Sequence, residues 1–144
     1  MDQEILVNSE IDDGKTILQV LSQQGFDVTA AAWLQAYEES QWDLFIASTV
    51  VDDRGGFEAY GYLNSIVDEI PGLGIDSMRV KLIGATSETA RAIVELRDRY
   101  PARIATKIGS QWLGRFLVDR GYIYPPVTSA TRATPPASPL PRAT

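Results

Sequence analysis

The chain contains neither cysteine nor histidine. Without cysteine it cannot form disulfides, use a thiolate nucleophile or hold zinc or an iron–sulfur cluster through sulfur. Without histidine it lacks the commonest general base and metal ligand at neutral pH. Any catalysis would therefore depend on Asp, Glu, Lys, Tyr or Ser side chains.

Long apolar runs and a basic N-terminal region are also missing. No apolar stretch approaches the roughly 20 residues that a membrane-spanning helix needs. The first residues, MDQEILVNSEIDDGK, are acidic where a signal peptide is basic, and their apolar run is too short. We therefore expect a cytoplasmic protein that makes no contact with a membrane.

Charge is distributed unevenly along the 144 residues, whose net charge is −6. Residues 1–96 contain 5 basic and 17 acidic side chains, whereas residues 97–144 contain 8 basic and 2 acidic ones. Two interpretations stay open. The two parts balance each other within one molecule, or the basic part forms a face for an acidic partner.

The apolar content of 44% is sufficient for one hydrophobic core, which predicts a single domain over residues 1–125. Residues 126–144 are rich in Pro, Ala and Thr and have almost no large apolar side chains. Such a segment cannot bury a core, so we expect a flexible tail. The alternative is a docking peptide that uses the sequences PASP or PLPR.

Hydrophobic periodicity predicts eight elements in the order α-β-β-α-β-α-β-β. The expected helices cover residues 9–24, 57–70 and 86–100, and the expected strands cover residues 26–37, 42–51, 77–84, 104–113 and 116–124. Hairpin strands mixed with helices are typical of an α+β domain. We expect a mostly antiparallel sheet of about five strands with about three helices packed on one face.

Acidic residues occur in pairs at two predicted element ends. Asp12 and Asp13 open the first helix, Asp52 and Asp53 follow the second strand, and Asp43 lies within that strand. If these ends met in space, the carboxylates could share a magnesium or manganese ion. The alternative is local hydrogen bonding, for which Asp is common at helix starts and turns. Beyond this metal we expect no cofactor.

A glycine loop in VDDRGGF suggests a second kind of site. Gly55 and Gly56 lead into a predicted helix, whose backbone N–H groups could hold a phosphate with Arg54 as the counter-charge. The pattern matches neither a Walker loop nor the dinucleotide-binding fingerprint. A plain turn is the alternative interpretation.

The stretch GSQWLGRFLVDRGYIYPP, residues 109–126, combines aromatic and basic residues. Aromatic side chains among basic ones are what a platform for single-stranded nucleic acid uses. The residues that would form it are Arg103, Lys107, Trp112, Arg115 and Arg120. The alternative is a structural hairpin with a turn at Gly114 and Arg115, in which the aromatics cover the core.

Two segments also carry a resemblance to a family. With its opening EILVNSEIDDGK and its C-terminal FLVDRGYIY, the chain resembles a group of small uncharacterised bacterial proteins with a C-terminal YIY strand. The resemblance implies a bacterial origin and a single domain over about the first 125 residues. It implies no activity and no catalytic residue.

Three functions are compatible with these observations. The first is a non-catalytic protein-interaction or accessory module of a bacterial cytosolic system, whose partner is another protein. The second is a metal-dependent enzyme or binder acting on phosphate esters or nucleotides, which requires the acidic pairs to converge. The third is nucleic-acid binding through the basic C-terminal hairpin, which requires its basic side chains on one exposed face.

Overall fold

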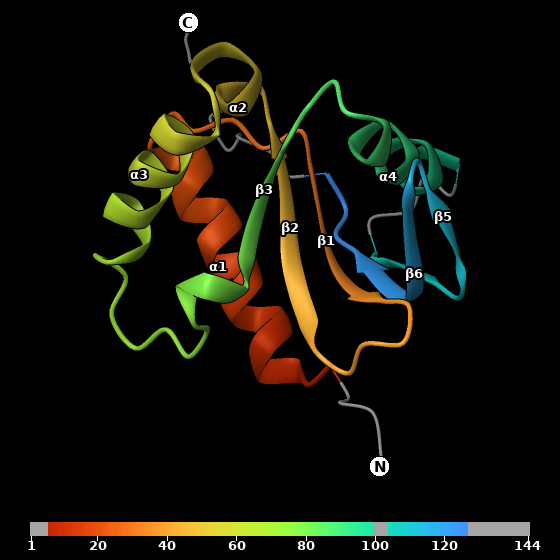
Figure 1. Ribbon diagram of the computed structural model, residues 1–144. Coiled ribbons are helices and arrows are strands. Elements are labelled where there is room, and N and C mark those ends of the chain that lie inside the picture. Colours follow the sequence, from red (N-terminus) through yellow and green to blue (C-terminus); the bar gives the residue numbers. More distant parts are fainter. Residues whose placement is uncertain (1–5, 100–103, 127–144) are drawn as a thin grey trace, which may run out of the picture.

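The computed structural model describes residues 6–99 and 104–126 (Figure 1). The α-helices are α1 (Asn8–Gln23), α2 (Thr49–Arg54), α3 (Gly56–Val67) and α4 (Glu88–Arg99), and a 3₁₀ turn, η1, spans Ser77–Arg79. The strands are β1 (Ala30–Ala36), β2 (Trp42–Ser48), β3 (Val80–Gly84), β4 (Thr106–Ile108), β5 (Gln111–Leu113) and β6 (Phe116–Ile123). These elements confirm the predicted α+β class.

One sheet of six strands organises the described residues, in the order β3-β2-β1-β6-β4, with β5 also paired to β6. The β2–β3 pair is parallel and the other pairs are antiparallel. The parallel pair follows from the crossover through α2 and α3, since parallel neighbours need such a connection. The expected strand over residues 104–113 is divided into β4 and β5 at Gly109 and Ser110, where the Ser110 hydroxyl donates to Asp119 Oδ1 at 2.9 Å.

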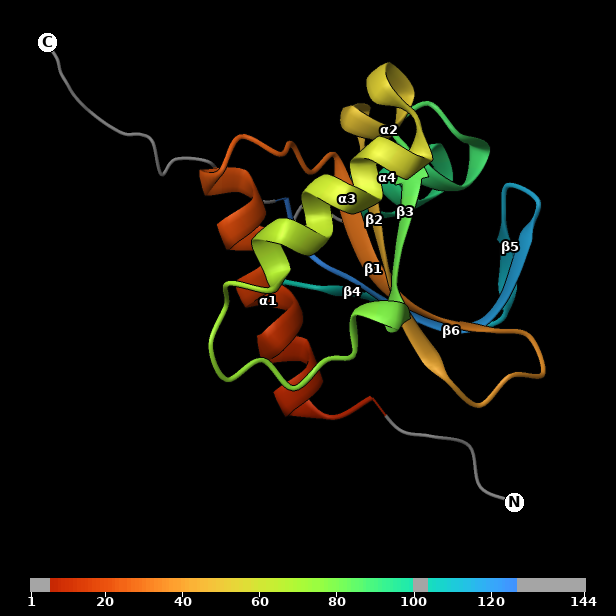
Figure 2. The ribbon, with the colours of Figure 1, turned by 60° about the vertical axis from the view of Figure 1, so that its left-hand side comes forward.

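Helices cover both faces of the sheet, which corrects the expectation that they pack on one face. Helices α1 and α3 lie on one side of the strands and α4 lies on the other (Figures 1 and 2). The reason is visible in β1, whose side chains are apolar on both faces. Ala31 and Trp33 belong to the core cluster under α1 and α3, whereas Ala32 and Leu34 belong to the cluster under α4.

Helix α2 is a second correction, because the sequence pattern predicts that the strand beginning at Trp42 continues to residue 51. Strand β2 ends instead at Ser48, whose side-chain oxygen accepts from the Val50 N–H at 3.1 Å. Asp27 accepts a further hydrogen bond from the Thr49 N–H at 3.2 Å. Side chains that satisfy the free N–H groups of a first turn favour helix, and here they outweigh the β-branched sequence that follows.

The outer edge of β3 is covered by helix α3. The Leu82 N–H donates to the Tyr60 hydroxyl at 2.8 Å, so a side chain takes the place of a further strand. Covering an edge in this way prevents pairing with another chain. Access to the sheet is therefore greater at the opposite side, where β6 is flanked only by the three-residue strands β4 and β5.

Candidate functional site

A groove lies between helix α1 and the part of the sheet that β6 and β4 form. Figure 2 shows the ribbon of β4 next to that of α1. The groove consists of two adjoining hollows of about 420 and 740 Å³. We call it the α1–β6 groove and define it by Ile11, Asp12 and Lys15 on α1, Tyr122 on β6, and Ile104 and Lys107 on the outer rim. The groove thus has a helical wall, a floor made by the sheet and a short outer strand.

Strand pairing explains why Tyr122 and Lys107 face the groove. Tyr122 is the antiparallel partner of Trp33 on one side and of Lys107 on the other. Directly opposed residues of antiparallel strands point to the same face, so the three side chains form one row. Trp33 is fully buried, Tyr122 is half-buried and Lys107 is exposed. The row therefore passes from the hydrophobic core into the open groove.

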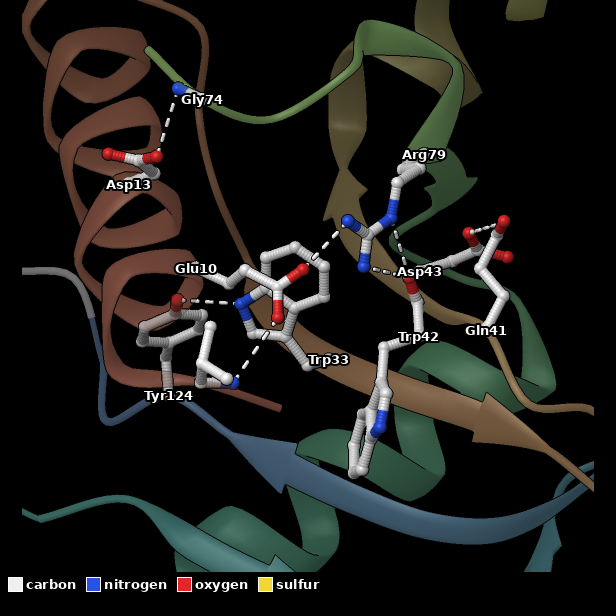
Figure 3. Close-up of polar contacts among 10 residues, drawn as sticks. Glu10, Asp13, Trp33, Gln41, Trp42, Asp43, Gly74, Arg79 and Tyr124 are labelled. Carbon is white, nitrogen blue, oxygen red and sulfur yellow. Dashed lines mark hydrogen bonds and ion pairs between the residues drawn. The ribbon is translucent and has the colours of Figure 1, made fainter. Parts of the chain in front are cut away.

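A buried hydrogen-bond chain fixes the helical wall against the sheet. The Trp33 Nε1–H donates to the Tyr124 hydroxyl at 2.9 Å (Figure 3). That hydroxyl donates to the Ile11 carbonyl oxygen at 2.7 Å. Gly14 lies at the same point of α1, and a Cβ there would collide with the Tyr124 hydroxyl. The spacing between α1 and β6, and hence the width of the groove, depends on these residues.

The guanidinium of Arg79 fixes the N-terminal end of the same helix. It pairs with Glu10 at 2.7 Å and donates to the Trp42 carbonyl oxygen from Nε and Nη2, at 3.0 and 2.7 Å (Figure 3). It also lies over the ring of Trp33, 5.3 Å from the centroid. Glu10 in turn accepts from the Val7 N–H at the helix start. The N-terminal half of the helical wall is therefore attached to the sheet at two neighbouring residues, Glu10 and Ile11.

Charges of both signs surround the groove. Asp12 is exposed on the helical wall, and Lys107 is exposed on the opposite rim. Partial burial, and to a smaller extent the charge of Asp12, raise the pKa of Tyr122 above its usual value. Arg120 lies at one end, where its Nε donates to Gln35 Oε1 at 3.0 Å and its guanidinium lies over the Trp42 ring. The groove can therefore pair with a ligand charge of either sign.

Residues from two separate hypotheses meet in this groove. Asp12 comes from the proposed metal site, and Lys107 and Arg120 come from the proposed nucleic-acid platform. Each of these side chains lines the larger hollow. The structure thus combines an acid and two bases that the sequence analysis assigned to different functions.

The remaining nucleic-acid candidates lie elsewhere. Trp112 and Arg115 belong to the β5–β6 hairpin and do not line the groove. Arg115 Nε lies 3.4 Å from Glu88 Oε1 of α4, and the Trp112 side chain is exposed. Arg103 falls outside the described residues. The nucleic-acid candidates that the structure describes are therefore divided between the groove and the β5–β6 hairpin next to α4.

The proposed metal ligands are held apart on different elements. Asp13 Oδ2 on α1 accepts from the Gly74 N–H at 3.0 Å, and Asp43 Oδ1 on β2 accepts from Gln41 Nε2 at 2.7 Å (Figure 3). Asp52 lies on α2 with Asp53. Within residues 6–99 and 104–126, no group of three or more acidic side chains could hold a metal ion. The convergence of carboxylates that the metal hypothesis requires does not occur in this part of the chain.

Asp52 has a structural partner that the sequence analysis did not foresee. Its carboxylate accepts from the Thr86 hydroxyl at 2.8 Å and from the Ala85 N–H at 2.7 Å. These hydrogen bonds, the one from the Thr86 hydroxyl first among them, lower the pKa of Asp52 below its ordinary value. The contact joins α2 to the loop that precedes α4.

The glycine loop is the junction of two helices. Helix α2 ends at Arg54, and Gly55, with φ at +86°, separates it from α3. The Gly55 N–H donates to the Val51 carbonyl oxygen at 2.9 Å, so it is already used within the fold. Arg54 pairs with Glu58 one turn later, at 3.6 Å, and Gly56 begins α3. The loop therefore joins two helices, α2 and α3, rather than a strand and a helix.

Apart from Asp12, the α1 residues that form the helical wall were not among the candidate site residues predicted from the sequence. Ile11, Lys15, Leu18 and Gln19 line the groove at the spacing of one helix face. The pattern that could have found them is the position of Asp12, Lys15 and Gln19 beside the apolar stripe of the helix. That pattern is common on helices that border a core, so by itself it does not indicate a groove.

Comparison with known proteins adds no family. No protein-family model matches the chain, and neither a curated protein nor a solved structure matches it. Among the described helices, none has both the length and the apolar character required to cross a bilayer.

Proposed function

We propose that this chain is a non-catalytic protein-interaction module that binds an extended segment of a partner protein in the α1–β6 groove. The observation that carries the proposal is the row from Trp33 through Tyr122 to Lys107, along which the apolar sheet surface continues out of the core. A half-buried aromatic floor with charged rims is typical of a peptide-binding surface.

The shape of the groove favours an extended segment. The helical wall from Asn8 to Gln19 is about 17 Å long, since an α-helix rises about 1.5 Å per residue. An extended peptide of about five residues covers that length. The two hollows are continuous along this wall because they share Ile11, Asp12 and Tyr122.

The chemistry of the groove also favours binding over catalysis. Its ionisable side chains are Asp12, Lys15, Lys107, Arg120, Tyr122 and Tyr124. Tyr122 has a raised pKa, which keeps it protonated at neutral pH, so it can donate a hydrogen bond but cannot act as a base. The two charged rims suit a partner whose backbone and side chains supply both donors and acceptors.

Selection from a random peptide display library with the full chain tests this function. We expect enrichment of peptides whose binding is lost in Ile104→Glu, because Ile104 is 71% exposed on the groove rim. The matched control is Met78→Glu, since Met78 is 75% exposed on η1, outside the groove. Both substitutions exchange an exposed apolar side chain for an acid, so both variants should fold.

Two results would contradict the proposal. One is a library that yields no enriched peptide. The other is a set of peptides that bind Ile104→Glu as well as the unchanged chain but lose affinity for Met78→Glu.

A further inference from the structure

We propose that the proline-rich segment of residues 127–144 occupies the α1–β6 groove of its own chain and competes there with the partner peptide. This inference rests on the proposed function, because it assigns a regulator to the same groove. The proposed occupant is part of this chain, and its four prolines and two arginines are known from the sequence.

The described chain ends at the groove itself, with Pro125 and Pro126. Strand β6 ends at Ile123, and the Tyr124 N–H makes a last bond to the Ala31 carbonyl oxygen at 3.0 Å. Pro125 and Pro126 then line the smaller hollow beside Lys15 and Tyr122. Residue 127 therefore follows directly from the wall of the groove, and no linker has to cross another surface.

The segment is rich in proline, which suits it to an aromatic groove. It contains Pro135, Pro136, Pro139 and Pro141, and its sequence PPASPLP is suited to the polyproline II conformation. Grooves lined by aromatic residues bind this conformation at low entropic cost, because the peptide is already extended before it binds. Tyr122 provides such a surface, with its ring 5.4 Å from that of Tyr124 and nearly perpendicular to it.

Charge gives the arginines of the segment a preferred place in the groove. Residues 127–144 contain Arg132 and Arg142 and no acidic side chain. Asp12 on the helical wall attracts these guanidinium groups, whereas Lys15 on the same wall and Lys107 on the outer rim repel them. The arginines should therefore lie beside Asp12 and away from both lysines.

The segment is long enough to extend along the whole groove. Residues 135–141 in polyproline II conformation span about 22 Å, enough to cover the wall of about 17 Å. Residues 127–134, fully extended, span about 26 Å, so they can carry the proline-rich part to either end of the groove. Attachment to the same chain gives a short segment an effective concentration in the millimolar range. A weak intrinsic affinity is therefore sufficient for occupancy.

The absence of cysteine makes a direct test possible, because Ala137→Cys in the full chain creates a single thiol for a nitroxide spin label. We expect the label to broaden the NMR amide signals of Lys15, Gln19 and Lys107, which line the groove. The signals of Arg91 and Glu95, exposed on α4 over the opposite face, should stay sharp. Adding Ile104→Lys to the labelled chain should remove the selective broadening, because a lysine there repels the two arginines of the segment, and adding Met78→Lys should not.

Two results would overturn the inference. The first is uniform weak broadening over both faces, which means that the segment samples the whole surface. The second is broadening that also appears when labelled chains without ¹⁵N are mixed with unlabelled ¹⁵N chains, which means that the segment binds a second copy.

The display experiment distinguishes this inference from the proposed function. If selective broadening occurs but no library peptide is enriched even by the chain whose four segment prolines are replaced by serine, the groove binds its own segment and the proposed function fails. If groove-binding peptides are found but the broadening is uniform, the function stands and this inference fails. Where both hold, replacing the four prolines of the segment by serine should tighten binding of a selected peptide several-fold.

Discussion

Gly14 faces the side chains of Tyr124 and Trp33, and its lack of a side chain makes this close contact between helix α1 and the sheet possible. A Cβ at this position would overlap the Tyr124 hydroxyl and lie 3.0 Å from Trp33 Nε1. Tyr124 cannot move away cheaply, since it is buried and its hydroxyl bonds to two partners. At the scale of single residues, this contact sets how closely the wall of the groove approaches its floor.

Gly14→Ala should therefore lower the free energy of unfolding by about 1–3 kcal/mol, through overpacking. The control is Gly61→Ala in helix α3, where a Cβ meets nothing within 4 Å. There the same substitution should raise the free energy of unfolding by about 0.5–1 kcal/mol, because alanine favours helix more than glycine does. Urea unfolding measures both. Equal effects of the two substitutions would contradict the role assigned to Gly14.

Tyr124 also predicts how stability depends on pH. Burial, as the largest cause, raises the pKa of Tyr124 above its ordinary value of 10.0. In the unfolded chain the phenol ionises near pH 10, whereas in the folded chain it keeps its proton to higher pH. The free energy of unfolding should therefore fall as pH rises above about 10, because the folded state binds more protons there.

Tyr124→Phe should reduce the steepness of this alkaline decline. At neutral pH the variant should be less stable by about 1–3 kcal/mol, because the buried Trp33 N–H loses its acceptor. Tyr122, whose pKa is also raised, still contributes to the decline in the variant. Urea midpoints measured from about pH 8 to 11 test the prediction. An unchanged slope in Tyr124→Phe would exclude Tyr124 as its source.

At the scale of elements, the short helix α2 connects the two faces of the sheet. Its Val50 and Val51 pack against the core cluster under α1 and α3. Its Asp52 accepts hydrogen bonds from Ala85 and Thr86, just before α4 on the other face. The helix that the strand pattern failed to predict is therefore a link between two layers.

Asp52→Ala should loosen this link locally. We expect faster hydrogen exchange at the Ala85 amide, which loses its nearer acceptor and keeps only the Ser48 carbonyl oxygen at 3.3 Å. Asp53→Ala is the control for loss of a neighbouring carboxylate. Because the pKa of Asp52 is lowered on folding, its contribution is present above about pH 3.8 and is lost as pH falls through the folded value. The difference between variant and unchanged chain should vanish in acid. A difference that persists there would mean that the charge is not responsible.

At the scale of the whole molecule, β1 belongs to both halves of the core. Trp33 contributes to the cluster under α1 and α3, and Leu34 contributes to the cluster under α4. Because β1 is buried on both faces, the loss of either layer of helices exposes apolar side chains of β1 to water. The described part of the chain should therefore unfold as one cooperative unit.

Ile93→Ala tests this cooperativity from the α4 side. Ile93 is buried, and the substitution should cost about 2–5 kcal/mol. Trp33 and Trp42 report from the opposite face, where they belong to the other cluster. We expect the urea midpoint seen by tryptophan fluorescence to shift together with the midpoint seen by circular dichroism. A shift in circular dichroism alone would show that the two layers unfold separately.

The sequence by itself determined those features that depend on neighbours along the chain. The period of two in β1 predicts its two faces, and the turn at Gly114, with φ at +66°, agrees with the predicted hairpin of β5 and β6. The missing cysteine and histidine exclude thiol and imidazole chemistry without reference to any structure. In each case the physical cause lies within one element or one turn.

The tertiary structure alone decided the composition of the groove. Asp12, Lys107 and Arg120 share one groove because α1 packs beside β6, through contacts such as that between Tyr124 and Ile11, 113 residues apart. The same packing placed α4 on the second face. It left the two aspartate pairs on different helices, Asp12 and Asp13 on α1 and Asp52 and Asp53 on α2. Periodicity shows which side of an element is apolar, but the element that covers that side depends on long-range packing.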